Sequence, residues 1–223
     1  MTTFALIPGA GGVAWYWHRL VPHLREAGHD PIAVELPGDD ESAGLPEYTQ
    51  LVVDAIGDRD DVVLVGQSLG AFTAPLVAAR VPVRGLVLVN GMIPSPGETP
   101  GAWWENTGSL QAREAAAERD GYSTQFDPAV YFLHDVPPEV AAAGEPHQRP
   151  EADAVFESVC NFEAWPSVPI RVVAGADDRF FPVDFQRTLA QDRLGLDANV
   201  LPGGHLIALS QPARLANYLL DAE

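Results

Sequence analysis

The chain has 223 residues, with 13 Lys or Arg against 31 Asp or Glu, so its formal net charge is −18. Nucleic acids and anionic membranes are poor partners for such a charge, because both are themselves negative. A length of 223 residues and a hydrophobic content of 47% suit one large domain with a well-buried core.

Short runs of β-branched and Leu residues alternate along the chain with longer segments of helical period. The predicted strands are residues 3–7, 31–36, 61–65, 84–90, 169–174 and 197–201. The predicted helices between and after them are residues 17–28, 69–80, 185–194 and 212–220. This alternation predicts an α/β fold with a mostly parallel sheet of about six strands flanked by helices.

The alternation stops between residues 92 and 166, a stretch rich in Pro, Gly, Ala and acidic residues. An insertion of this length after the fourth predicted strand is either a lid or a disordered segment. The helix-forming run 111–119 and several aromatic side chains favour a helical lid. We therefore expect a core of residues 1–91 and 167–223, with residues 92–166 as the lid.

Residue types that are rare or missing exclude further classes of catalytic and binding site. All basic residues are Arg, so a Schiff-base lysine, a phosphate-binding loop lysine and a Ser-Lys dyad are impossible. The single cysteine, Cys160, cannot form an internal disulfide, and no zinc-type spacing of Cys and His occurs.

Without a secretory leader pattern or an apolar run of membrane length, we expect a cytoplasmic protein. The sequence leaves its oligomeric state open.

The sharpest motif is a Ser between two glycines, Gly66-Gln67-Ser68-Leu69-Gly70, after an apolar strand and before a helical run. A Ser at such a sharp turn requires glycine two residues away on either side, because a side chain there would collide with neighbouring backbone. The Ser hydroxyl then projects above the sheet, near the positive end of the following helix. This pattern predicts that Ser68 is a catalytic nucleophile.

A Ser nucleophile needs a base and an acid, which in this architecture follow it along the chain in the order acid, then His. Asp178 follows the predicted strand 169–174, and His205 follows the strand 197–201. His205 is predicted to take the proton of Ser68, and Asp178 to orient its imidazole. Asp177 remains the alternative acid, although its side chain also suits the turn itself.

Acyl transfer also requires hydrogen-bond donors for the developing oxyanion. One predicted donor is the backbone N–H of Leu69, directly after the nucleophile, and the other is that of Ala10 in the loop after the first strand. The same loop is a weak match for a dinucleotide-binding motif, since it lacks the last glycine in register. No metal or organic cofactor is expected.

With these residues assigned, the chain resembles the α/β-hydrolase superfamily over nearly its whole length. Within it, Trp15-Tyr16-Trp17, Ala27-Gly28-His29 and the stretch 131–140 are similar to the plant methylesterase and hydroxynitrile lyase branch and its bacterial esterase relatives. The resemblance implies an α/β-hydrolase fold, with Ser68, Asp178 and His205 matching the family triad and Ala10 and Leu69 its oxyanion donors.

Two positions depart from the family pattern, and two others separate its esterase members from its lyases. Pro8 and Gln67 stand where many members have His, which we expect to alter loop support rather than chemistry. The lyases of this branch use a Lys beside the catalytic His and a Thr in the oxyanion loop, whereas this chain has Leu206 and Gly9 there. The resemblance therefore favours an esterase over a lyase.

We expect a serine hydrolase that cleaves a carboxylic ester through an acyl-enzyme, on a small aromatic or medium-chain acyl substrate that includes methyl esters and lactones. The alternatives on the same fold are a lyase, a cofactor-free oxygenase and a small-molecule receptor. Apolar residues of the lid and of the loops near the triad are candidates for the substrate pocket: Trp103, Trp104, Phe132, Trp165, Phe180 and Leu206.

Overall fold

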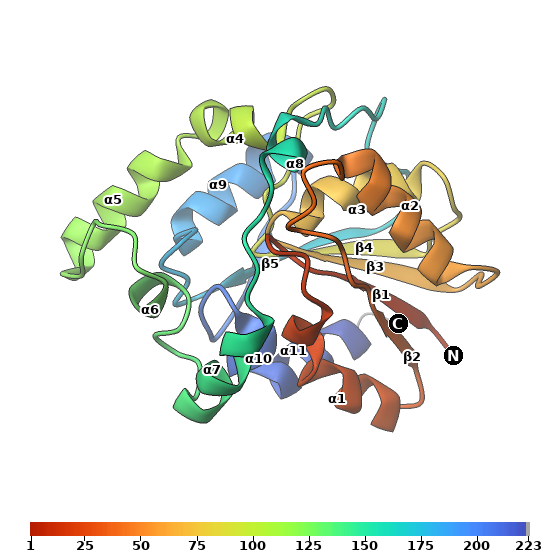
Figure 1. Cartoon of the computed structure of the whole chain (residues 1–223), viewed down its shortest axis with the longest axis horizontal. Coiled ribbons are helices and arrows are strands. Elements are labelled where there is room, and N and C mark those ends of the chain that lie inside the picture. Colours follow the sequence, from red (N-terminus) through yellow and green to blue (C-terminus); the bar gives the residue numbers. More distant parts are fainter. Residues whose placement is uncertain (222–223) are drawn as a thin grey trace.

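The computed structural model describes residues 1–221 and contains one parallel sheet, with strands in the order β2-β1-β3-β4-β5-β6 (Figure 1). The strands are β1 Thr3–Ile7, β2 Asp30–Ala33, β3 Val62–Gln67, β4 Gly85–Val89, β5 Ile170–Gly175 and β6 Ala198–Leu201. The predicted α/β class with about six parallel strands is confirmed. The predicted core segment 167–223 ends with residues 222–223, which lie outside the described part of the chain.

Helices cover both faces of the sheet. Side chains that alternate along β1 point to opposite faces, with Ala5 and Ile7 in one apolar cluster and Phe4 and Leu6 in the other. The first cluster packs under α2 Leu45–Ile56, α3 Gly70–Ala78 and α9 Val183–Leu194. The second packs under α1 Leu20–Glu26, α10 Ile207–Ser210 and α11 Pro212–Leu220. A sheet buried on both faces explains why its strands are continuously apolar.

Two predicted elements differ from those observed by more than two residues at one end. The strand predicted over residues 31–36 ends at Ala33, because the chain then turns toward the loop after β1, where the N–H of Leu36 donates to the carbonyl of Gly12 at 2.8 Å. The segment predicted as one helix over residues 17–28 is a 3₁₀ turn, η1 Ala14–Trp17, followed by α1.

Helix α2 was not predicted from the sequence. Its signals are present: Pro46 in the first turn, a Glu47 side chain that accepts from the N–H of Gly44 at 2.8 Å, and buried residues at helical spacing. The buried residues of α2 are Leu45, Tyr48, Thr49, Val52 and Ile56. This stripe packs against α3 and against β1.

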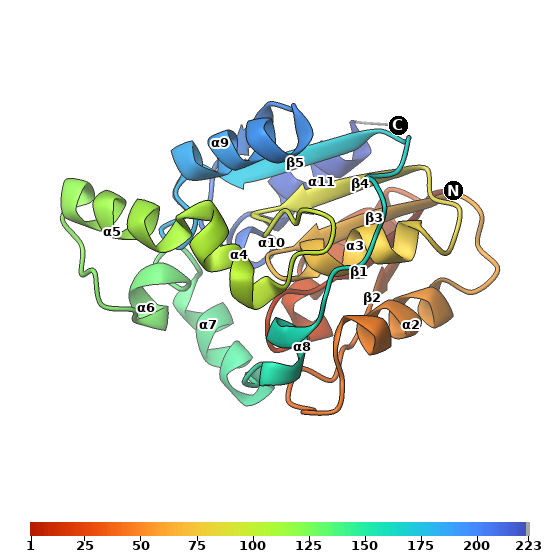
Figure 2. The same cartoon turned by 90° about the horizontal axis from the view of Figure 1, so that it is seen from above.

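Helices also fill the long connection between β4 and β5. They are α4 Pro100–Thr107, α5 Ser109–Asp120, α6 Pro128–Tyr131, α7 Pro138–Gly144, η2 Glu145–His147 and α8 Asp153–Glu157. Figures 1 and 2 show α4 to α7 beyond the carboxyl ends of the strands, on the side toward which the strand arrows point. The described part of this connection contains no strand.

The connection is tied to the core at its start. Trp103 is fully buried against the rings of Phe181 and Phe185, and its indole N–H donates to the carbonyl of Ile93 at 3.0 Å. Arg193 on α9 forms an ion pair with Glu98 at 2.8 Å. Among residues 1–221, no helix has both the length and the apolar character needed to cross a membrane.

Candidate active site

Ser68 occupies a strained turn between β3 and α3. Its φ of 49° lies in the left-handed region, which non-glycine residues rarely adopt. A Cβ on Gly66 would lie 2.8 Å from the carbonyl oxygen of Gly70, and a Cβ on Gly70 would lie 2.6 Å from that of Pro8. Both glycines are therefore required sterically, as the motif predicted. The turn is anchored by the N–H of Ser68, which donates to the carbonyl of Val89 at 3.1 Å.

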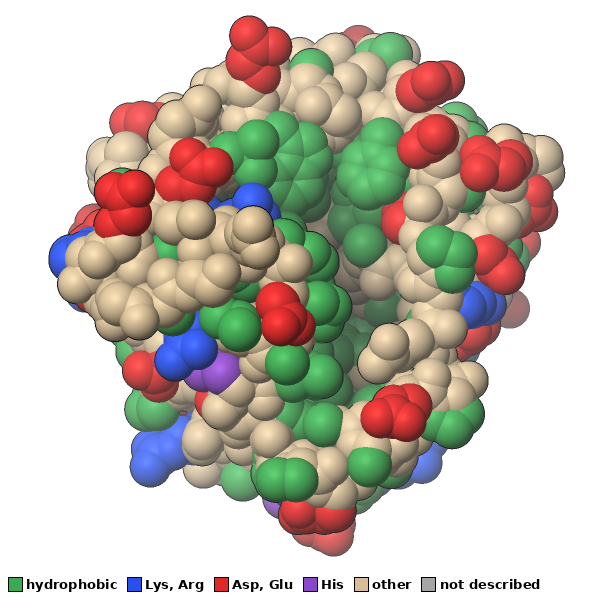
Figure 3. Space-filling model, turned by 60° about the vertical axis from the view of Figure 1, so that its left-hand side comes forward, with side chains coloured by type: hydrophobic (Ala, Val, Ile, Leu, Met, Phe, Trp, Pro, Cys, Tyr) green, Lys and Arg blue, Asp and Glu red, His purple; other side chains and the backbone are tan. Residues whose placement is uncertain are grey.

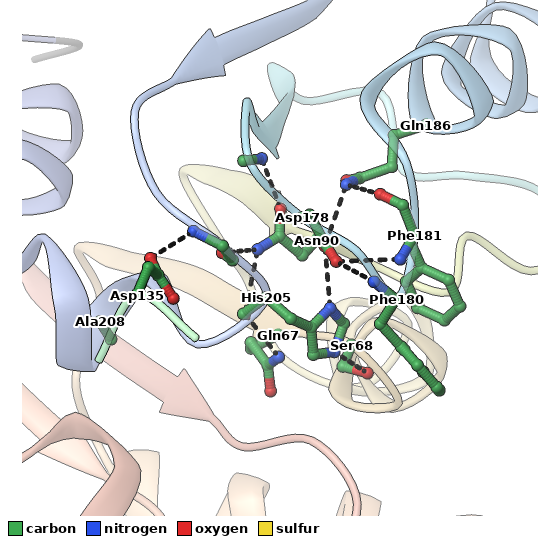
Figure 4. Close-up of polar contacts among 12 residues, drawn as sticks. Gln67, Ser68, Asn90, Asp135, Asp178, Phe180, Phe181, Gln186, His205 and Ala208 are labelled. Atoms are coloured by element: carbon green, nitrogen blue, oxygen red, sulfur yellow. Dashed lines mark hydrogen bonds and ion pairs between the residues drawn. The ribbon is translucent and has the colours of Figure 1, made fainter. Parts of the chain in front are cut away.

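The structure brings Ser68, His205 and Asp178 into a continuous line of hydrogen bonds (Figure 4). Ser68 Oγ lies 3.1 Å from His205 Nε2, and His205 Nδ1 lies 2.9 Å from Asp178 Oδ2. All three side chains are buried. Since a carboxylate can only accept, Nδ1 carries the proton, which leaves Nε2 free to accept the hydroxyl proton of Ser68.

The two adjacent aspartates have different partners. Asp178 Oδ1 accepts the N–H groups of Phe180 and Phe181 at 2.8 and 2.9 Å, while Oδ2 faces His205. The carboxylate of Asp177 instead accepts the N–H of Gly203 at 3.2 Å. The geometry therefore pairs Asp178, rather than Asp177, with His205.

The residues predicted to supply the oxyanion donors both border the space beside Ser68. Ala10 and Leu69 line the same cavity as the Ser68 side chain. The loop of Ala10 lies close to the nucleophile, because a Cβ on Gly9 would be 3.0 Å from the Cβ of Ser68 and 2.4 Å from Oε1 of Gln67. Leu69 directly precedes α3, where the helix dipole favours negative charge.

A cavity of about 470 Å³ opens above Ser68, and Figure 3 shows a hollow lined by hydrophobic side chains on this face of the molecule. Four of the six residues predicted to bind substrate line this cavity: Trp104, Phe132, Phe180 and Leu206. Trp103 and Trp165 do not. Trp103 points into the core, and Trp165 packs beside Phe162 at a ring distance of 5.3 Å.

Aromatic rings surround the imidazole of His205. Phe132 stacks on it at 5.1 Å, and Phe180 and Phe181 meet it edge-on at 5.1 and 5.2 Å. Tyr16 lines the cavity, and burial raises the pKa of its hydroxyl above the ordinary value, so this group stays neutral. The space above Ser68 therefore suits an apolar, uncharged group.

Two further polar side chains support the His205 loop and were not predicted. Asn90, at the end of β4, donates to the carbonyl oxygens of Gly204 and His205. Asp135, from the connection between β4 and β5, accepts the N–H of Gly204 at 2.6 Å (Figure 4). A buried Asn at the end of an apolar strand was the available signal for Asn90, whereas the contact of Asp135 depends on how the connection folds back.

In the part of the chain that the structure describes, no group of three or more His, Cys, Asp or Glu side chains is arranged to hold a metal ion. The lone Cys160 is buried, and its Sγ donates to the carbonyl of Phe72 at 3.2 Å. Burial raises the pKa of this thiol to about 12, so it is a poor nucleophile.

The chain is similar in sequence and in fold to several known proteins. A model described as "Alpha/beta hydrolase family" matches residues 4–218. Norfluorocurarine synthase 1 from a Strychnos species is 24% identical over 252 residues, covering 98% of this chain and 94% of its own. The alpha-hydroxynitrile lyase of Arabidopsis thaliana is 25% identical over 244 residues, covering 97% of this chain and 95% of its own.

Polyneuridine aldehyde esterase from Rauvolfia serpentina is 24% identical over 249 residues, covering 98% of this chain and 94% of its own. A crystal structure of polyneuridine aldehyde esterase has a TM-score of 0.80 at 22% identity, covering 100% of this chain and 99% of that one. The structural likeness confirms the predicted fold. The relatives also include plant esterases and a methylesterase, which confirms the resemblance to that branch.

Proposed function

The chain belongs to the alpha/beta hydrolase family, and on that premise we propose that it is a serine carboxylic-ester hydrolase that works through an acyl-enzyme. The observation that carries the proposal is the line of contacts from Ser68 through His205 to Asp178 at the floor of an apolar cavity. A neutral imidazole that accepts from a Ser hydroxyl and donates to a buried carboxylate is the arrangement that activates a Ser nucleophile.

In the first half-reaction, Ser68 Oγ attacks the ester carbonyl carbon while His205 Nε2 takes its proton. The carbonyl oxygen becomes an oxyanion, which accepts hydrogen bonds from the N–H groups of Ala10 and Leu69. Asp178 stabilises the imidazolium that forms. The bond from the carbonyl carbon to the alkoxy oxygen then breaks, and His205 returns its proton to the departing alcohol.

In the second half-reaction, His205 takes a proton from a water molecule as that water attacks the acyl carbon. The same two amides stabilise the second oxyanion. When it collapses, the bond to Ser68 Oγ breaks, the proton passes from His205 to Ser68, and a carboxylic acid is released. The enzyme returns to its starting state.

The cavity supports a substrate with a small aromatic or medium-chain acyl group, methyl esters and lactones included. Trp104, Phe132 and Phe180 offer flat apolar surfaces near His205. We propose that residues 92–166 form a lid over this site, since Trp104, Phe132 and other residues from this stretch line the cavity. The volume of about 470 Å³ is in the range of small-molecule sites.

Esterase chemistry is favoured over the cyanohydrin cleavage named for one relative. The chain has no Lys, and Leu206 follows His205, so no ammonium group is available beside the imidazole. The imidazole is instead enclosed by the rings of Phe132, Phe180 and Phe181. Several relatives are named as esterases, which agrees with this proposal.

The test is to react the purified protein and its Ser68→Ala variant with a fluorophosphonate and to locate the adduct by intact mass and peptide mapping. We expect one adduct, on Ser68, in the wild type alone. An ester panel varied in acyl and alcohol size then defines the substrate, with turnover lost in Ser68→Ala. Folded protein that neither reacts nor turns over any ester would contradict the proposal and would favour a receptor, a lyase or an oxygenase on the same fold.

A further inference from the structure

Gly11, the residue after Ala10, is held at both its N–H and its carbonyl by one short segment, residues 149–151. The N–H of Gly11 donates to Oε2 of Glu151, and the carbonyl of Gly11 accepts from Nε of Arg149 at 3.2 Å. The approach is close, because a Cβ on Gly11 would lie 2.8 Å from the backbone carbonyl oxygen of Arg149. Gly11 also has a φ of 85°, so only glycine fits there without strain.

Glu151 is itself held in place. Its Oε1 accepts the hydroxyl of Tyr48 at 2.5 Å, and Tyr48 is a buried residue of α2. The next residue, Ala152, donates its N–H to the carbonyl of Gly38 at 2.6 Å. The Glu151 side chain thus has fixed donors on both of its oxygens, Tyr48 on one and Gly11 on the other. Burial raises the pKa of Glu151, although the hydrogen bonds from these two donors act in the opposite direction.

Arg149 links the same loop to the segment that follows β2. Its guanidinium donates to the carbonyl of Leu36 at 3.1 Å and pairs with Glu35 at 2.5 Å. The other carboxylate oxygen of Glu35 accepts the N–H of Ala14 at 2.7 Å. Side chains thus hold the loop after β1 at Gly11 and Ala14, on the side of Ala10 away from β1.

We propose that Glu151, with Arg149, is a positioning residue that sets the orientation of the Ala10 amide toward the oxyanion. This inference rests on the proposed esterase function. The N–H of Gly11 belongs to the peptide that joins Ala10 to Gly11, so a hydrogen bond to Glu151 restricts rotation about the Ala10 backbone. An oxyanion donor acts only when its N–H points at the developing charge, and a small misplacement costs rate.

Arg149 and Glu151, which hold Gly11, both belong to the proposed lid, the stretch 92–166. The connection between β4 and β5 therefore has two roles. It lines the cavity, and its segment 149–151 supports the loop that carries an oxyanion donor. A change in this connection is expected to alter transition-state stabilisation without touching Ser68, His205 or Asp178.

The test compares Glu151→Ala, Glu151→Gln and the control Asp153→Asn, which removes an exposed carboxylate two residues along the same segment. We expect Glu151→Ala to lower kcat by about 10- to 100-fold with KM within about twofold, since the loss falls on the transition state. Glu151→Gln keeps one acceptor oxygen for Gly11 and should retain most of the rate. Asp153→Asn should equal the wild type.

A second readout separates positioning from general loss of structure. A boronic acid forms a tetrahedral adduct on Ser68 whose oxygen occupies the oxyanion position, whereas the carboxylic acid product binds without one. Glu151→Ala should weaken boronate binding by about the factor by which kcat/KM falls, and leave product binding unchanged. If the Ala variant does not fold, Glu151→Met takes its place, because it fills the space without an oxygen acceptor.

Three results would overturn the inference: kcat within twofold of the wild type in Glu151→Ala, unchanged boronate affinity despite a lower rate, or equal loss of boronate and product binding. Fluorophosphonate labelling of Ser68 in the wild type distinguishes this failure from failure of the esterase proposal. If the wild type is labelled and turns over ester, the esterase proposal stands. Any of the three results for Glu151→Ala then contradicts the positioning role alone.

Discussion

The side-chain amide of Asn90 donates a hydrogen bond of 3.0 Å to the backbone carbonyl of His205 (Figure 4). The same amide group donates to Gly204 at 3.0 Å, and its oxygen accepts the N–H of Gly175 at 2.7 Å. Asn90 is fully buried and has a φ of 46°. One side chain at the end of β4 therefore ties the loop that carries His205 to the end of the strand that leads to Asp178.

Replacing Asn90 with Ala should lower both stability and rate. The change leaves the N–H of Gly175 buried without its acceptor, which costs about 1–3 kcal/mol of unfolding free energy. Release of the His205 loop should reduce kcat by about tenfold or more. Urea unfolding and steady-state kinetics on one ester measure the two effects. Asn90→Gly is the matched control for backbone strain, and a full rescue of kcat by Gly would contradict the role of the amide.

The positive φ of Ser68 predicts a stability difference between two inactive variants. Ser68→Ala and Ser68→Gly both remove the hydroxyl, but only Gly adopts a φ of 49° without steric cost. The Gly variant should be more stable than the Ala variant by about 1 kcal/mol. Chemical denaturation of both proteins measures the difference. Equal stability would show that the turn carries no strain at this position.

Two neighbouring tryptophans should respond differently to replacement. Trp103 is fully buried in the core, so Trp103→Ala should lower the unfolding free energy by about 3–5 kcal/mol. Trp104 lines the cavity, so Trp104→Ala should raise KM for aromatic esters several-fold with a smaller loss of stability. Thermal melts and kinetics on a matched pair of aromatic and short-chain esters test both. A similar KM change for the two esters would contradict an aromatic contact with Trp104.

The buried pair of Glu98 and Arg193 predicts how stability depends on pH. Burial acts to raise the pKa of Glu98, but hydrogen bonds from Arg193, Ser95 and Asn106 outweigh it and hold that pKa below its ordinary value. The folded state thus prefers the carboxylate, and the stability from this pair is present above the unfolded pKa of about 4.3. It is lost as the pH falls through the lower folded pKa.

Glu98→Gln should therefore be less stable than the wild type at pH 7, by about 3 kcal/mol if Arg193 is left without a charged partner. The difference should shrink when unfolding is measured at acidic pH. Glu105→Gln, which changes an exposed carboxylate of α4, serves as the control. If the difference in unfolding free energy between Glu98→Gln and the wild type stays constant from pH 7 to acidic pH, the assigned direction of the Glu98 pKa shift is contradicted.

Elements with strong local sequence patterns were predictable without the structure. The alternation of apolar strands and helical segments predicted a parallel α/β sheet, and α11 begins and ends where its period placed it. The glycines around Ser68 predicted its turn because steric exclusion acts between residues that are close along the chain. Helix α2 carried local signals too, in its capping and apolar spacing, and could have been predicted.

Contacts between residues that are distant along the chain depend on the folded structure. Trp103 and Trp104 share one helix and both were predicted to bind substrate, yet only Trp104 lines the cavity. For Asp177 and Asp178 the sequence favoured Asp178, and it is Asp178 that contacts His205. The contact between Glu151 and Gly11 likewise joins segments that are far apart along the chain. Local pattern specifies backbone conformation, whereas the direction in which a loop side chain points depends on the packing of segments that meet only in the folded chain.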